Sequence, residues 1–208
     1  VAGVVYAGRK EEMDEHKARY AQETPARKLP ELLPGADIFL GLSAARVLKA
    51  EWLAQMAAKP LILALANPEP EIMPDLAKAA RPDAVIATGR SDFPNQVNNV
   101  LCFPFIFRGA LDVGATTVNE AMKLATVRAL ADLARAEQSD IVARAYGVEV
   151  LRFGPEYLIP RPFDPRLIVM IAPAVAKAAM DSGVATRPIA DFDAYREKLT
   201  QFVYHSGL

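Results

Sequence analysis

The sequence predicts an α/β fold in which helices cover both faces of a parallel sheet. Three short, continuously apolar runs predict buried strands at residues 36–41, 61–66 and 84–87. Helix-permissive segments separate these runs, and such alternation is typical of parallel strands joined by crossover helices. The second half of the chain is expected to be mostly helical.

In the first half, residues 11–21 are charged and permit a helix, and residues 28–33 predict a short helix or turn. Residues 44–58 have helical spacing, with an apolar face, and residues 75–80 predict a short helix. The residues of that apolar face are Val47, Leu48, Trp52, Leu53 and Met56.

The second half carries several helix boundary signals. Asn98 or Asn99 is expected to start a helix whose early turn holds Pro104, and Thr117 with Glu120 has the spacing of a capping box. Further helices are predicted after Asp164-Pro165 and after Asp191 or Asp193. The helix after Thr117 is expected at residues 120–136, and a further helix at residues 139–146. The helix after Asp164 is expected at residues 165–182 with a kink near Pro173, and the last helix is expected to reach about residue 204.

Composition limits the class of protein. The 208 residues suffice for one large domain or two small ones, and a hydrophobic content of 52% supports a sizeable core. A net charge of −1 argues against a general binder of nucleic acids or membrane surfaces. No signal peptide or membrane-length apolar run is visible, so a cytoplasmic location is expected. The single cysteine, Cys102, is expected to be a buried packing residue.

Ligands of open parallel sheets collect at the carboxyl ends of the strands. The three predicted strands end in small, polar or turn-forming residues, of which Asn67 is the most specific candidate. Pro68 favours an extended conformation at Asn67, from which the carboxamide can face a ligand. The alternative is an ordinary Asn-Pro turn. The three strand ends read Gly41-Leu42-Ser43, Asn67-Pro68-Glu69 and Thr88-Gly89-Arg90.

Two adjacent carboxamides, Asn98 and Asn99, lie between the third strand and an apolar helical segment. A helix start has unpaired N–H groups and a partial positive charge, which suit a carboxylate or phosphate. The alternative is an Asn-rich turn whose side chain only caps the helix.

Several common motifs are absent from the sequence. Neither G-x-G-x-x-G nor G-x-x-x-x-G-K-[ST] occurs, and no cluster has the spacing of metal ligands. His16 and His205 are expected to be exposed, and Glu69 and Glu71 to lie in a solvated loop. Taken alone, the sequence therefore predicts a ligand-binding α/β half-site without an obvious acid, base or metal.

Long strings of the sequence resemble the C-terminal part of the malic enzyme region in bacterial NADP-dependent malic enzymes. The most specific is Gln96-Val97-Asn98-Asn99-Val100, and the resemblance covers almost the whole chain. The other matching strings span residues 36–41, 64–72, 81–84, 88–113, 153–157 and 163–167.

The resemblance implies oxidation of (S)-malate with NADP and decarboxylation to pyruvate, with Mg²⁺ or Mn²⁺ as the metal. It places Asn67 near nicotinamide and malate, and Asn98 and Asn99 against the malate carboxylate. Lys17 falls where NADP-preferring members place a lysine against the ribose 2′-phosphate. The alternative is that Lys17 is one of several solvated charges in its helix.

The implied fold is an incomplete three-layer, dinucleotide-binding (Rossmann-like) parallel sheet with a helical C-terminal extension. The expected domains are a partial NAD(P)-binding domain at residues 1–115 and the extension at residues 116–208. The family's catalytic Tyr and Lys, its metal ligands and its Gly-rich loop have no counterpart here, so the isolated chain is expected to be an inactive fragment.

Expected partners are malate or pyruvate, an upstream malic-enzyme half, a downstream phosphotransacetylase-like domain and further copies in a homo-oligomer. The alternatives are an NAD-linked malic enzyme, or a non-catalytic oligomerisation or regulatory module.

Overall fold

The computed structural model describes residues 3–136 and 151–206, the last three of these by their backbone only. The chain forms two compact units, Val1–Ala87 and Thr88–Leu208. These units reflect packing, whereas the predicted boundary after residue 115 concerns the extent of the cofactor-binding domain. That boundary stays a prediction.

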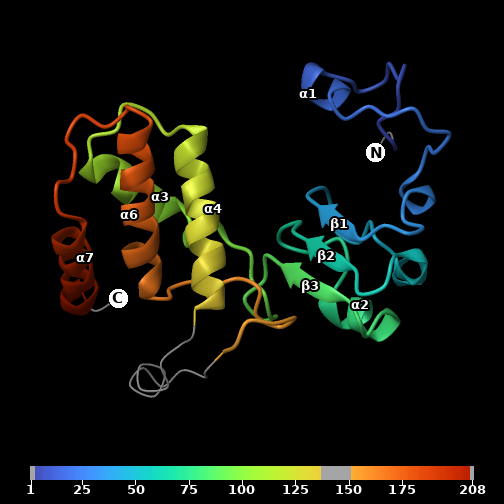
Figure 1. The fold of residues 1–208 in the computed structure, drawn as a ribbon. Coiled ribbons are helices and arrows are strands. Elements are labelled where there is room, and N and C mark those ends of the chain that lie inside the picture. The colour runs from blue at the N-terminus through green and yellow to red at the C-terminus, as the bar shows by residue number, and fades with distance from the viewer. Residues whose placement is uncertain (1–2, 137–150, 207–208) are drawn as a thin grey trace. The chain divides into compact units, whose positions relative to one another are not determined.

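The first unit is built on a three-stranded sheet with the order β1-β2-β3. The strands are β1 (Ile38–Gly41), β2 (Leu61–Ala64) and β3 (Val85–Thr88). β1 and β2 are parallel, with Ile38 opposite Leu61, and the three arrows point the same way in Figure 1. The predicted α/β class and its three strands are confirmed.

Three helical segments of the first unit enclose a small core with this sheet, namely η1 (Leu29–Glu31), η2 (Ala50–Gln55) and α2 (Pro74–Ala80). The short helix α1 (Glu15–Ala18) contributes no buried residue to that core. Leu53 of η2 and Ile62 of β2 are fully buried in the core, whereas Ile38 and Leu40 of β1 are exposed. The prediction that helices cover both faces of the sheet is therefore wrong at β1, of which only one face packs on the core.

The helix predicted for residues 44–58 is wrong over most of its length, because only the 3-10 helix η2 forms there. The amides of Arg46 and Leu48 donate to the carbonyl oxygens of Pro70 and Glu71, at 3.1 and 3.0 Å. These long-range hydrogen bonds replace the local bonds that a helix would need, and Arg46 has a positive φ of 60°.

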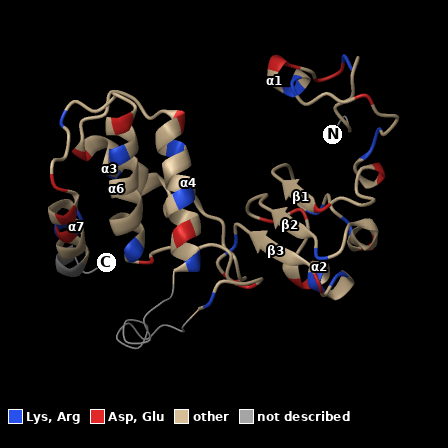
Figure 2. Cartoon of the chain, viewed as in Figure 1, with Lys and Arg blue, Asp and Glu red and all other residues tan. Residues whose placement is uncertain are grey.

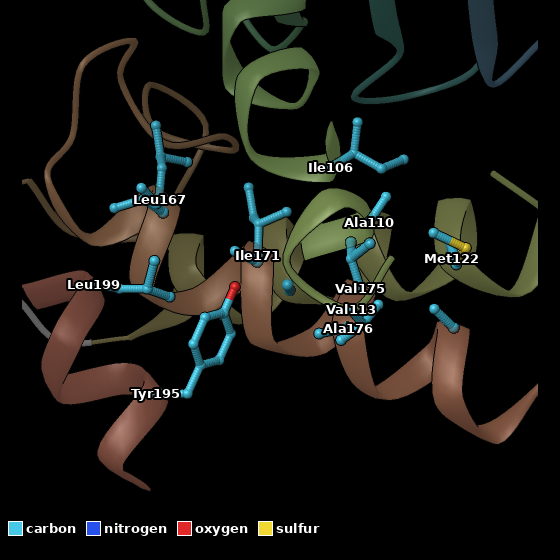
Figure 3. Close-up of a cluster of buried hydrophobic side chains, with 14 of the residues drawn as sticks. Ile106, Ala110, Val113, Met122, Leu167, Ile171, Val175, Ala176, Tyr195 and Leu199 are labelled. Carbon is cyan, nitrogen blue, oxygen red and sulfur yellow. The ribbon is translucent and has the colours of Figure 1, made fainter. Parts of the chain in front are cut away.

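The second unit is helical. It contains η3 (Asn99–Leu101), α3 (Phe103–Asp112), α4 (Glu120–Arg135), α6 (Arg166–Asp181) and α7 (Phe192–Ser206). Figure 3 shows the core where α3, α6 and α7 meet, with Ile171 of α6 and Leu199 of α7 fully buried. Gly109 permits close packing of α3 on α6, because a Cβ atom there would lie 2.4 Å from the carbonyl oxygen of Ala172.

The ends of the long helices correct one prediction and refine another. The capping box proposed for Thr117 is wrong, because Asn119 caps α4 and its Oδ1 accepts from the amide of Met122 at 3.1 Å. Pro165 is the N-cap of α6 and not its first helical residue. The helix predicted for residues 139–146 lies outside the described residues.

Positively and negatively charged residues both occur along the helices, where blue and red segments interrupt the tan ribbon (Figure 2). Within the part of the chain that is described, no helix combines the length and apolar character needed to cross a membrane.

Candidate functional site

The carboxyl ends of β1 and β2 present exposed side chains in the first unit. Leu42, which follows β1, is 72% exposed, and Ser43 and Asn67 are also exposed. Among the described residues, no hydrogen bond engages the carboxamide of Asn67, so its donor and acceptor groups face solvent. The Asn67–Pro68 peptide bond is cis.

Glu71 lies beneath these two strand ends and is fully buried, which corrects the prediction of a solvated acidic loop. Its Oε1 atom accepts from the amide of Ser43 at 2.9 Å, and its Oε2 atom accepts from the amide of Ala66 at 3.0 Å. A buried carboxylate is costly unless hydrogen bonds replace its hydration. The two amides supply that replacement and connect the segments that follow β1 and β2.

Glu69, two residues earlier, behaves as the sequence predicts for a surface acid. Its carboxylate forms an ion pair with the Arg46 guanidinium at 2.9 Å, and both side chains are substantially exposed. An exposed pair of this kind contributes little stability. Of the two acids beside Pro70, only Glu71 therefore organises the strand ends.

The last residue of β3, the fully buried Thr88, is also the first residue of the second unit. Its Oγ1 accepts from the amide of Arg90 at 3.2 Å, and its carbonyl oxygen accepts from the amide of Val97 at 2.8 Å. These bonds close residues 88–97 into a compact loop that leads to the asparagine pair.

Asn95 holds this loop and was not among the predicted site residues. Its Nδ2 donates to the carbonyl oxygen of Pro155, and its Oδ1 accepts from the amide of Leu158, both at 2.7 Å. Asn95 has a positive φ of 56°, a conformation that Asn tolerates better than most residues. Its place among four carboxamides within five residues is the sequence signal that identifies it as a turn residue.

Asn98 and Asn99 are neighbours at the start of η3, and both are exposed. The Oδ1 atom of Asn98 accepts from the amide of Val100 at 3.0 Å, so Asn98 caps η3. The prediction that Asn98 or Asn99 starts the helix that holds Pro104 is wrong, because that helix, α3, begins at Phe103 after Cys102. No hydrogen bond in the described part of the chain involves the Asn99 side chain. The pair thus divides into one capping carboxamide and one carboxamide that faces solvent.

Lys17 lies in the short helix α1 of the first unit. Its Nζ donates to the carbonyl oxygen of Glu12 at 2.6 Å and lies 3.6 Å from Oδ2 of Asp14. Hydrogen bonding of Asp14 to the Lys17 amide lowers the pKa of that carboxyl group, and the Lys17 charge adds to the effect. Both side chains remain about half exposed, so a phosphate would have to compete with these local partners.

The remaining candidate reactive side chains are one cysteine and two histidines. Cys102 is partly buried, and burial raises the pKa of its thiol. The His16 side chain is 76% exposed, while the side chain of His205 lies outside the described residues. Residues 3–136 and 151–203 include no group of three or more His, Cys, Asp or Glu side chains arranged to hold a metal ion.

Comparison with known proteins places this arrangement in a family. The chain is 70% identical over 207 residues to an NADP-dependent malic enzyme of Salmonella typhimurium, and equally identical to an NAD-dependent malic enzyme of Rhizobium meliloti. These alignments cover 99% and 100% of this chain but only 27% of each relative.

Solved structures agree with the sequence relatives. The crystal structure of malic enzyme from Entamoeba histolytica superposes with a TM-score of 0.77 at 31% identity, and the match covers 99% of this chain and 42% of that one. The model of the malic enzyme NAD binding domain matches residues 1–144. The chain therefore belongs to the malic enzyme family, and most of its length corresponds to the NAD binding domain of that family.

Proposed function

We propose that this chain is the cofactor- and substrate-binding part of an NADP-dependent malic enzyme. The complete enzyme would oxidise (S)-malate and release pyruvate and CO₂. The observation that carries the proposal is the exposed Asn67 carboxamide at the carboxyl end of β2, in a chain that matches the malic enzyme NAD binding domain. In open parallel sheets this edge is where ligands bind.

The strand ends of the first unit suit a nicotinamide cofactor. Leu42 offers an exposed apolar surface, and Asn67 offers a donor and an acceptor one strand away. When bound, the cofactor would supply the acceptor for a hydride from malate. Asn67 would orient the reacting groups by hydrogen bonding, which reduces the entropic part of the barrier.

The asparagine pair of the second unit is assigned to the malate carboxylate. The Nδ2 group of an asparagine is uncharged and can donate to a carboxylate. Such a hydrogen bond is charge-assisted, because the acceptor is ionised, and is stronger than one between two neutral groups. The Nδ2 atom of Asn98 is still available for this role, because its cap uses only Oδ1. Asn99 would contribute its whole carboxamide.

The described residues do not fit a site for Mg²⁺ or Mn²⁺, since they contain no suitable cluster of ligands. The proposal therefore assigns the metal, and the groups that transfer protons, to other parts of the longer enzyme. It also includes a cytoplasmic location and a homo-oligomer, as the sequence predicts.

The test is malate-dependent reduction of NADP by a full-length enzyme that contains this sequence, with Mn²⁺ present. Asn67→Ala should lower kcat/KM for malate by about 10- to 150-fold, the loss expected for a hydrogen bond to a charged group. A wild-type enzyme that reduces no NADP with malate would refute the proposed activity. An unchanged kcat/KM in the variant would remove Asn67 from the site.

An NAD-linked malic enzyme is the second candidate. It is favoured by one observation, the 70% identity to the NAD-dependent malic enzyme of Rhizobium meliloti. The ratio of kcat/KM with NADP to kcat/KM with NAD, measured on the same full-length enzyme, separates the two candidates.

A further inference from the structure

The buried carboxylate of Glu71 links the two strand ends at which the proposed site begins. Its two oxygens accept from the amides of Ser43 and Ala66, which follow β1 and β2 respectively. We call these three residues the Glu71 brace. Ala66 directly precedes Asn67, so the brace fixes the backbone from which the Asn67 carboxamide projects.

The chemistry of the brace suits a carboxylate. Both partners are N–H donors, and a carboxylate is a pure acceptor with two oxygens. Glutamine would have the same shape, but its NH₂ group would face one of the two donors. In the part of the chain that is described, Glu71 forms no ion pair, so these amide hydrogen bonds are what compensate its burial.

The surrounding backbone is built around this side chain. Residue 41 is glycine, and a Cβ atom there would lie 2.4 Å from Cδ of Glu71 and 2.7 Å from Oε1. The carbonyl oxygens of Pro70 and Glu71 accept from the amides of Arg46 and Leu48. The segment that carries Glu71 is thereby anchored to the segment that follows β1.

We propose that Glu71 is a positioning residue for catalysis, which acts through Asn67. The inference rests on the proposed function, because it assumes that Asn67 contacts the reacting groups. Glu71 itself is buried beneath the strand ends and does not touch the substrate. Its carboxylate holds the Ala66–Asn67 backbone at a fixed distance from the end of β1.

A double-mutant cycle tests this in the full-length enzyme, with Glu71→Gln, Asn67→Ala and the combined variant. Glu71→Gln should lower kcat/KM for malate by about 10- to 100-fold, because small misplacements of a positioning group are costly. In the Asn67→Ala background the same substitution should cost about 2-fold or less, since the effects of two residues that act as one unit are not additive. Glu69→Gln is the matched control and should change kcat/KM by less than about 2-fold, because its ion pair is exposed.

The outcomes distinguish a failure of the proposed role of Asn67 from a failure of the proposed role of Glu71. If Asn67→Ala leaves kcat/KM unchanged, the proposed role of Asn67 fails first. If Asn67→Ala lowers kcat/KM, and Glu71→Gln lowers it by the same factor in the Asn67→Ala background as in the wild type, Glu71 does not act through Asn67. That result overturns the inference.

Should Glu71→Gln not fold, Gly41→Ala displaces the same carboxylate and must show the same dependence on Asn67. If neither variant folds, as judged by circular dichroism, Glu71 serves folding alone and the inference is again overturned.

Discussion

The side chain of Glu71 occupies the space in which residue 41 would carry its Cβ atom. The distance from that Cβ position to Cδ of Glu71 is 2.4 Å, which is shorter than any real contact. Gly41 is therefore required by the buried acid and not by its own backbone conformation.

Gly41→Ala should lower the free energy of unfolding by about 1–3 kcal/mol, the usual cost of overpacking a core. Urea unfolding of the 208-residue chain measures this change. Gly89→Ala is the matched control at the end of β3, where a Cβ atom would find its nearest neighbour, the carbonyl oxygen of Val97, at 3.8 Å. Equal stability of the two variants would contradict the close approach at Gly41.

Tyr195 of α7 donates its hydroxyl proton to Oδ2 of Asp112 in α3, at 2.6 Å. The same oxygen accepts from Nε of Arg108 at 2.6 Å. Tyr195→Phe should cost about 1–3 kcal/mol of stability at neutral pH, because it removes a hydrogen bond to a charged group. Tyr20→Phe, at a side chain that is 75% exposed, should leave the stability unchanged.

The contribution of Tyr195 should depend on pH in the alkaline range. Burial raises the pKa of Tyr195, and its hydrogen bond to the Asp112 carboxylate raises it further. The protonated form is thus favoured in the folded state, so its contribution is complete below the unfolded pKa of about 10 and declines as the pH rises through the higher folded pKa. The stability difference between wild type and Tyr195→Phe should shrink above about pH 10. A constant difference up to the pH of alkaline unfolding would argue against this linkage.

Substitutions of Asn98 and Asn99 should differ in their effects on stability and on activity. Asn98 caps η3, so Asn98→Ala should lower stability by about 0.5–2 kcal/mol, while Asn98→Ser should retain most of the cap. Asn99→Ala should leave stability within about 0.5 kcal/mol, as surface substitutions usually do. In the full-length enzyme, Asn99→Ala should nevertheless lower kcat/KM for malate by about 10- to 150-fold. Loss of stability without loss of activity at both positions would reduce the pair to a cap.

Cofactor choice is tested at Lys17. In the full-length enzyme, Lys17→Gln should lower kcat/KM with NADP by the equivalent of about 1–3 kcal/mol and leave NAD use unchanged, because NAD lacks the 2′-phosphate. Lys28→Gln, at another exposed lysine of the first unit, is the control. If the ratio of NADP to NAD efficiency does not move, the local contacts of Lys17 with Glu12 and Asp14 are its whole role.

The sequence alone determined the three strands, because short continuous apolar runs bounded by turn-forming residues are typical of buried strands. It also placed Asn67 at a strand end and Asn98 at a helix start, since both follow from local signals. The error at Thr117 was local as well. Asn119 is an equally good cap two residues later, and its Nδ2 also donates to Oγ of Ser182, which only the packing of α4 against α6 makes available.

Only the tertiary structure decided the role of Glu71. Two glutamates flank Pro70, and nothing in their spacing distinguishes the one that pairs with Arg46 at the surface from the one that is buried. The distinction arises because the chain after β2 folds back beneath the end of β1, where the Ser43 and Ala66 amides and the absent side chain of Gly41 create a place for a carboxylate. The same return of the chain supplies the carbonyl oxygens that replaced the helix predicted for residues 44–58. Hydrogen bonds between residues distant in sequence thus determined the structure of residues 44–58 and the burial of Glu71, which local periodicity does not predict. A backbone amide can be satisfied by a distant acceptor as well as by the carbonyl oxygen four residues before it.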